Sequence, residues 1–315
     1  MRSTRALLVI LLLAAATVAA PSSASAQSNA SAQSNSAAQQ AKTQPAGQPG
    51  TGSGEYVGAT VCQGCHDELY KGFEASPHWM TTQETKMTRG AHGCESCHGP
   101  GSAHVEGGGD KTKIFSFTAA KSGDITKRCL TCHESNPEQR EFMRSTHNEN
   151  GASCTSCHSL HHAKAEYLLV SKQPALCYSC HAEQRADFQK PFRHRVNEGL
   201  IKCTDCHNAH GTLRDRQVRS APNQDLICVK CHADKRGPFV FEHEPVRVEG
   251  CTACHTPHSS VYPRMLLTAR INTLCLQCHV QIPVGVHGAQ NQYRQACIVC
   301  HNSIHGSNVS NLFFK

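Results

Sequence analysis

The chain repeats one pentapeptide, Cys-x-x-Cys-His, ten times, and these motifs use all 20 of its cysteines. Two thiols three residues apart can form thioether bonds to the two vinyl groups of one porphyrin, and the histidine that follows can then bind the porphyrin iron. The pattern therefore predicts ten covalently bound haem c groups.

The predicted thioether residues are Cys62, Cys65, Cys94, Cys97, Cys129, Cys132, Cys154, Cys157, Cys177, Cys180, Cys203, Cys206, Cys228, Cys231, Cys251, Cys254, Cys275, Cys278, Cys297 and Cys300. The predicted proximal iron ligands are His66, His98, His133, His158, His181, His207, His232, His255, His279 and His301.

Other uses of paired cysteines fit the pattern poorly. A zinc ribbon needs two pairs for each metal and has no reason to place histidine after every second cysteine. Disulfide frameworks vary their spacing, and a thioredoxin-like pair occurs once, in a βαβ context that is not seen here. The histidine after all ten pairs favours haem over each of these alternatives.

The motifs form a longer repeat. From Cys94 onward, alternate motifs begin 60, 49, 48 and 46 residues apart, and the motifs between them begin 48, 51 and 47 residues apart. The repeating unit is a leading histidine, a motif, a trailing histidine, a spacer and a second motif. We interpret it as a two-haem module of about 48 residues.

This register sorts the histidines outside the motifs. Five leading and five trailing positions supply ten further imidazoles, which we predict to be the distal iron ligands. They are His78, His104, His147, His161, His194, His210, His243, His258, His287 and His305. His92 and His162 are left over. His161 is favoured over His162 because it lies three residues after the motif histidine, as in two other modules, but both remain candidates.

Methionine is the alternative axial ligand. Met80, Met87, Met143 and Met265 follow the N-terminal apolar segment, and none repeats in phase with the motifs. We therefore expect two histidines on every iron. Because haem chemistry on a substrate needs an open or exchangeable iron site, the sequence predicts electron transfer and no catalytic residues.

The N-terminus resembles a secretory signal peptide. Arg2 and Arg5 precede an apolar run, and Ala24-Ser25-Ala26 offers a cleavage site, so residues 1–26 are predicted to be removed on export. Residues 27–54 are rich in Ala, Ser, Gln, Pro and Gly, which predicts a disordered linker. The predicted location is the periplasm.

Composition predicts a core that depends on haem. Leu, Ile, Val and Phe make up less than a fifth of the chain, which is too few for an ordinary core. Short helices are expected at 67–74, 137–145 and 174–181, and no alternating run suggests a sheet. The predicted fold is a haem-organised multihaem cytochrome c, mostly coil with short α-helices and little or no β-structure.

The formal charge of +7 does not indicate a nucleic-acid partner. Haem propionates would offset it, and many of the basic side chains are expected to balance these propionates.

The segments GATVCQGCHDELYKGFEASPHWM and GAHGCESCHGPGSAHVEGGG resemble the start of the periplasmic decahaem cytochromes of the MtrA and DmsE type, which include PioA-like members. The resemblance extends in motif count and rhythm over residues 55–315. It implies an elongated double pentahaem that inserts into an outer-membrane β-barrel porin. It also implies a periplasmic or inner-membrane cytochrome as one electron partner, and an extracellular cytochrome, reductase or mineral as the other.

Accordingly, we divide the chain into an N-terminal pentahaem half, 55–186, and a C-terminal half, 187–315. The first half holds five motifs but four phased distal candidates, so either His162 or His92 serves it, or a histidine such as His194 reaches back across the boundary. The leading function is an electron conduit across the outer membrane. The alternatives are a free periplasmic shuttle or electron store, then a multihaem reductase or a polymerising extracellular cytochrome.

Overall fold

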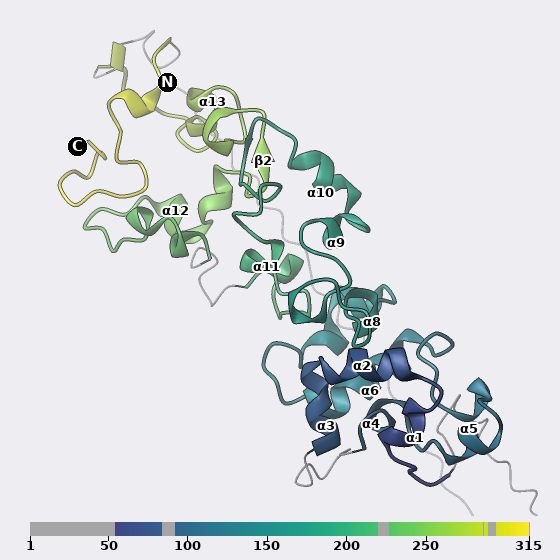
Figure 1. The fold of residues 1–315 in the computed structure, drawn as a ribbon. Coiled ribbons are helices and arrows are strands. Elements are labelled where there is room, and N and C mark those ends of the chain that lie inside the picture. The colour runs from purple at the N-terminus through teal and green to yellow at the C-terminus, as the bar shows by residue number, and fades with distance from the viewer. Residues whose placement is uncertain (1–53, 84–91, 220–226, 286, 289–293, 315) are drawn as a thin grey trace, which may run out of the picture. The chain divides into compact units, whose positions relative to one another are not determined.

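The structure is a computed structural model, and it describes residues 54–83, 92–219, 227–285, 287–288 and 294–314 (Figure 1). The predicted signal peptide and nearly all of the predicted linker lie outside the described residues. Within the described ranges, no helix is long and apolar enough to cross a bilayer.

Short helices joined by turns and coil make up most of the described chain. The α-helices are α1 Ala59–Gln63, α2 Asp67–Glu74, α3 Met80–Gln83, α4 Glu95–His98, α5 Ser102–Glu106, α6 Ser122–His133, α7 Thr146–Glu149, α8 Cys154–Cys157, α9 Ala175–Tyr178, α10 Ala182–Asp187, α11 Cys203–Cys206, α12 Glu244–Val248 and α13 Ile271–Cys275. The 3-10 helices are η1 Pro77–Trp79, η2 Lys111–Lys113, η3 Phe142–Arg144, η4 Glu166–Leu168, η5 Asp215–Gln217, η7 Cys228–Lys230, η8 Ala233–Lys235, η9 Cys251–Ala253, η10 Pro263–Met265 and η11 Cys297–Val299.

Regular β-structure in the described ranges is one antiparallel pair of two-residue strands. Strand β1 (Phe192–Arg193) pairs with β2 (Ser259–Ser260), with Phe192 opposite Ser260. The predicted fold, mostly coil with short helices and little β-structure, is therefore confirmed.

The three predicted helices have different outcomes. The helix predicted at 67–74 is confirmed as α2, and the one predicted at 174–181 is reduced to α9. The segment 137–145 is mostly turn and ends in η3, so that prediction was wrong in extent. The side chain of Asn136 accepts a hydrogen bond from the backbone N–H of Glu138 at 2.9 Å, which favours a turn at this point.

Buried large apolar side chains are few, and all of those described lie between Tyr70 and Val196. Tyr70 and Phe73 on α2 pack edge-on against Trp79, with ring centres 5.3 and 5.8 Å apart. The full set of buried large apolar residues is Tyr70, Phe73, Phe115, Ile125, Phe142, Phe188 and Val196.

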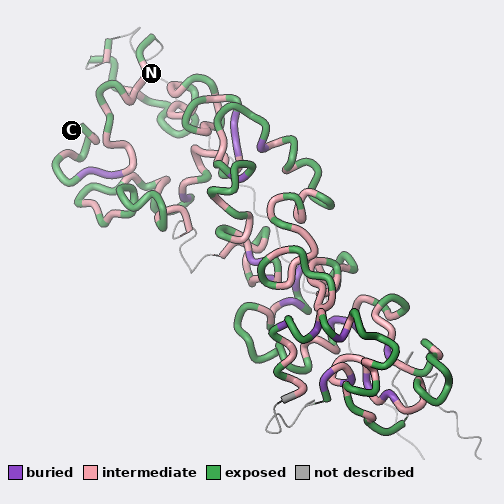
Figure 2. Tube along the Cα trace, in the orientation of Figure 1, coloured by how far each residue is buried: buried purple, intermediate pink, exposed green. Residues whose placement is uncertain are grey.

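After Val196, the buried residues that the structure describes are small or polar, such as Asn208, Ser259 and Ser307. Figure 2 shows the buried segments as short stretches separated by longer ones of intermediate and exposed residues. Side-chain packing alone therefore gives this region little hydrophobic stabilisation.

Candidate haem-binding sites

Each motif forms one turn of helix. The backbone N–H of the motif histidine donates to the carbonyl of the first cysteine, as in His66 to Cys62 at 2.9 Å and His207 to Cys203 at 2.9 Å. Residues three and four apart lie on the same face of a helix. The turn thus brings two thiols and an imidazole to one side of the backbone, as attachment to one porphyrin requires.

Successive motifs are neighbours in space as well as in sequence. The first cysteines of adjacent motifs lie near enough to interact in the pairs Cys62–Cys94, Cys129–Cys154, Cys177–Cys203 and Cys275–Cys297. The second cysteines interact electrostatically in the pairs Cys97–Cys132, Cys157–Cys180, Cys206–Cys231 and Cys254–Cys278. These contacts link the first to seventh motifs in sequence order, and likewise the eighth to tenth.

Every motif histidine faces one of the ten predicted distal histidines. The ring centres are 5.9 to 6.3 Å apart in the pairs His66–His104, His98–His161, His133–His78, His158–His210, His181–His147, His207–His258, His232–His194, His255–His305, His279–His243 and His301–His287. Bonds between a metal and an imidazole nitrogen are about 2 Å long, so two imidazoles on opposite sides of one ion have ring centres roughly 6 Å apart. The spacing and the donor type both fit a haem iron between the rings.

The two histidines left over by the register are placed elsewhere. His92 stacks on Tyr56, with ring centres 3.8 Å apart and planes 11° from parallel. His161, rather than His162, lies opposite His98. Within the described ranges, no group of three or more His, Cys, Asp or Glu side chains is arranged to hold a metal ion.

The pairs cross between modules. His210 follows the sixth motif, yet it faces His158 of the fourth, and His258 likewise faces His207. His210 thus faces the one motif histidine of the predicted N-terminal half, 55–186, that no distal candidate of that half faces. From the sequence, this place was open to His92, His162 or a histidine such as His194.

Backbone carbonyls hold five of the motif histidines. The Nδ1–H groups of His98, His158, His207, His255 and His301 donate to the carbonyls of Phe115, Tyr167, Arg216, Arg264 and Leu312, over 2.6 to 2.9 Å. Such a bond places the proton on Nδ1 and leaves the Nε2 lone pair free to bind a metal. These five belong to the first motif of each module.

Four of the predicted distal histidines are held in a related way. Nδ1 of His147 donates to the carbonyl of Ala209 at 2.8 Å, and Nδ1 of His194 donates to that of Pro257 at 2.5 Å. Nδ1 of His104 and of His287 donates to the backbone carbonyls of Asp110 and Pro283, at 2.9 and 3.1 Å. These acceptors cannot be predicted from residue type, because every residue has a carbonyl. The nine-residue offset from His158, His207 and His255 to their acceptors was the available signal.

Burial lowers the pKa of six of the predicted distal imidazoles. Burial, followed by the nearby charge of His158, lowers the pKa of His210 to about 4. Burial also lowers the pKa of His78, His161, His243, His258 and His305. A neutral imidazole has a lone pair available for iron at neutral pH.

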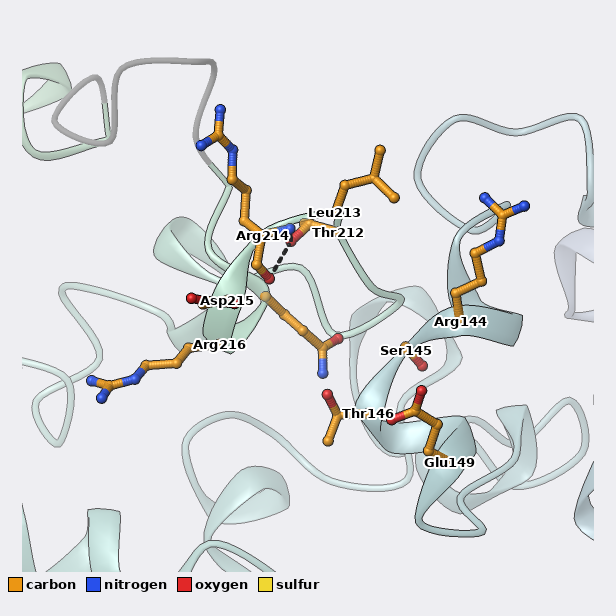
Figure 3. Close-up of a pocket in the computed structure, with 10 residues that line it drawn as sticks. Arg144, Ser145, Thr146, Glu149, Thr212, Leu213, Arg214, Asp215 and Arg216 are labelled. Carbon is orange, nitrogen blue, oxygen red and sulfur yellow. Dashed lines mark hydrogen bonds between the residues drawn. The ribbon is translucent and has the colours of Figure 1, made fainter. Parts of the chain in front are cut away.

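One hollow of about 370 Å³ lies between the N-terminus of α7 and the loop at 212–217. Figure 3 shows that Arg144, Arg214 and Arg216 point in different directions, away from Thr146. The charged groups therefore do not converge on a ligand position, and we assign none to this hollow.

Comparison with protein families agrees with this geometry. The model described as "Doubled CXXCH motif" matches residues 147–186, 194–237 and 243–282. Each match begins at a leading histidine and spans two motifs, which confirms the predicted two-haem module. The model described as "Cytochrome c554 and c-prime" matches residues 104–159. The motifs, their pairing and these matches define a multihaem c-type cytochrome that carries covalently bound haem c.

Two relatives show which family of multihaem cytochromes the chain resembles. The chain is 31% identical to the multihaem cytochrome MtrA of Shewanella baltica over 275 residues, covering 80% of this chain and 79% of the relative. It is 28% identical to the cytochrome c-type protein NrfB of Escherichia coli over 125 residues, covering 34% of this chain and 65% of the relative. The chain belongs to the MtrA family, as the sequence resemblance predicted, and it is an electron-transfer protein.

Proposed function

We propose that the ten histidine pairs are the axial ligands of ten haem c groups. The motif histidines are the proximal ligands, and His78, His104, His147, His161, His194, His210, His243, His258, His287 and His305 are the distal ligands. The support is that all ten pairs have the ring spacing of two imidazoles on one iron. The helical turns present the thiols, and the carbonyls orient the imidazoles.

These haems form an electron conduit in our proposal. When bound, haem c supplies reversible one-electron chemistry at its iron. The observation that carries this proposal is the sequence-ordered contact between motif cysteines, such as Cys129 with Cys154 and Cys157 with Cys180. Such contacts set the attachment points in an order that runs along the chain. A string of neighbouring redox centres is the arrangement that electron transport over distance needs.

We propose further that the protein is not an enzyme. Each of the ten motif histidines faces a second imidazole. Two histidines on each iron would leave none of the haems the open coordination site that substrate chemistry requires.

The family resemblance suggests where the conduit works. We propose that the chain is exported to the periplasm through cleavage near residue 26 and enters an outer-membrane β-barrel porin. A periplasmic or inner-membrane cytochrome would then exchange electrons at one end, and an extracellular cytochrome or reductase at the other. A second candidate is a free periplasmic shuttle or electron store, which uses the same haem chain without a barrel.

Co-purification from membranes tests this placement. The tagged, full-length, haem-loaded protein is expressed in its native host, and outer membranes are solubilised in mild detergent. We expect an outer-membrane β-barrel protein to co-elute in a fixed ratio and to persist through size exclusion. Recovery of the whole pool as a soluble monomer without a barrel would contradict the conduit and favour the shuttle.

A further inference from the structure

Three modules contain the same strained loop. Nine residues after the motif histidine, Tyr167, Arg216 and Arg264 each have a positive φ, of 60°, 55° and 60°. In every case the next residue has a positive φ as well, between 54° and 58°. The left-handed conformation is disfavoured for residues other than glycine, and its occurrence at an equivalent position three times indicates a selected feature.

The three left-handed residues share their carbonyl contact and not their side chains. Their carbonyls accept the Nδ1–H of His158, His207 and His255 at 2.8, 2.9 and 2.8 Å. One residue is tyrosine and two are arginine, and all three are exposed. Since neither side-chain chemistry nor packing is common to them, the function of the loop lies in its backbone.

Further backbone bonds close each loop around the motif. In the module of His207, the N–H of Asn208 donates to the carbonyl of Gln217 at 2.8 Å, and the N–H of Arg219 donates to that of Cys206 at 2.7 Å. The modules of His158 and His255 have the equivalent bonds. The carbonyl that faces the imidazole is thereby fixed relative to the thiols.

We propose that Tyr167, Arg216 and Arg264 are positioning residues that use the left-handed backbone to aim a carbonyl at the proximal imidazole. The bond increases the electron donation of that histidine to its iron and so lowers the reduction potential of the haem. This inference rests on the proposed axial ligation. It adds a backbone feature that lowers the reduction potential of the haems attached at the fourth, sixth and eighth motifs.

Two substitutions at Arg216 separate backbone conformation from side chain. Arg216→Gly removes the arginine and permits a positive φ without penalty. Arg216→Pro also removes it but fixes φ near −65°, so the carbonyl must turn away from His207. Both variants lose the same charge, and the comparison between them isolates the hydrogen bond.

The readout is a spectroelectrochemical titration of the full-length, haem-loaded protein. Haem content and spin state of the unaltered protein are measured first, because a deficit there contradicts the axial ligation itself and not the effect of this backbone feature. We expect the glycine variant to titrate as the unaltered protein does. In the proline variant, one-tenth of the haem absorbance should shift to higher potential, and the same pair at Arg264 should repeat the result.

The other possible results for these two variants also support or contradict the proposal. Loss of one low-spin haem in Arg216→Pro, with all retained in Arg216→Gly, supports the proposal because a misaimed imidazole is a weaker ligand. Titration curves that coincide for both fully loaded variants would overturn it. Loss of several haems from the proline variant would also contradict it, since a purely structural turn predicts that result.

Discussion

Nδ1 of His147 donates a hydrogen bond to the carbonyl of Ala209 over 2.8 Å, although 62 residues separate them. The residue after Ala209 is His210, whose ring faces His158. Two consecutive residues therefore contribute to two haem sites. Ala209 orients the histidine that faces the fifth motif, and His210 faces the fourth. The same arrangement recurs at Pro257 and His258, which contact His194 and His207. Each of these dipeptides lies in the module that follows the two haem sites, and it contacts a histidine of each site.

Removal of His210 should open one haem. We expect His210→Ala to leave the fourth motif's iron without a distal ligand, giving a high-spin ferric EPR signal that accounts for one haem in ten. The reduced variant should bind one carbon monoxide molecule, which the unaltered protein should not. His92→Ala is the control, because His92 stacks on Tyr56 and faces no motif histidine in the described structure. A wholly low-spin spectrum for His210→Ala would rule out this pairing.

The choice between two adjacent histidines gives a second prediction. His161 lies 6.3 Å from His98 between ring centres. We expect His161→Met to give histidine–methionine ligation at one haem and raise its potential, and His162→Met to change nothing in a redox titration. The reverse outcome would assign the iron to His162.

Close packing around the distal histidine of the fourth motif predicts a stability effect. Gly211 has φ of +100°, and a Cβ atom there would lie 2.8 Å from the carbonyl oxygen of Glu141 and 2.9 Å from Cβ of Ser145. We expect Gly211→Ala to lower the free energy of unfolding by about 2 to 4 kcal/mol through strain and overpacking. Urea unfolding followed by circular dichroism measures this loss.

The matched control for that substitution is Gly123→Ala. Gly123 lies in α6, and a Cβ atom there meets nothing within 4 Å. Alanine is the better helix former, so this variant should be unchanged or more stable by about 0.5 kcal/mol. Equal effects of the two substitutions would mean that the contact between Gly211 and Glu141 is not tight.

A buried carboxylate inside the second motif links the first described residues to the segment that follows this motif. Glu95 is 2% exposed and accepts hydrogen bonds from the backbone N–H groups of Val57, Gly58 and Gly101, at 3.0, 2.9 and 2.7 Å. We expect Glu95→Gln to lower the free energy of unfolding by about 2 kcal/mol, because an amide cannot accept all three bonds. The exposed Glu106→Gln should cost about 0.5 kcal/mol or less in the same urea assay. A Glu95 variant as stable as the Glu106 variant would contradict this role.

The sequence predicted the haem-attachment residues and the short-helix fold because both follow from local patterns. A Cys-x-x-Cys-His turn needs nothing beyond its own five residues, and the predicted α2 is an amphipathic segment that begins with Asp67. The ten distal candidates were also predictable, since they recur in phase with the motifs.

Pairing was beyond the sequence because it is spatial. Nothing local indicates that His158 meets His210, 52 residues further on, or that its Nδ1 is bound by the carbonyl of Tyr167. Glu95 was missed for a similar reason. Nothing within the motif itself indicates that the chain folds the N–H groups of Val57 and Gly58 onto this side chain.

The central claim is ten haems, each with two histidine ligands. Its most direct test is the haem-to-polypeptide ratio of the purified protein, from mass spectrometry and the pyridine haemochrome, together with the EPR spectrum of the same oxidised sample. We expect ten haems per chain and only low-spin ferric signals. Fewer than ten haems on a fully processed chain, or a high-spin signal from the unaltered protein, would contradict the account.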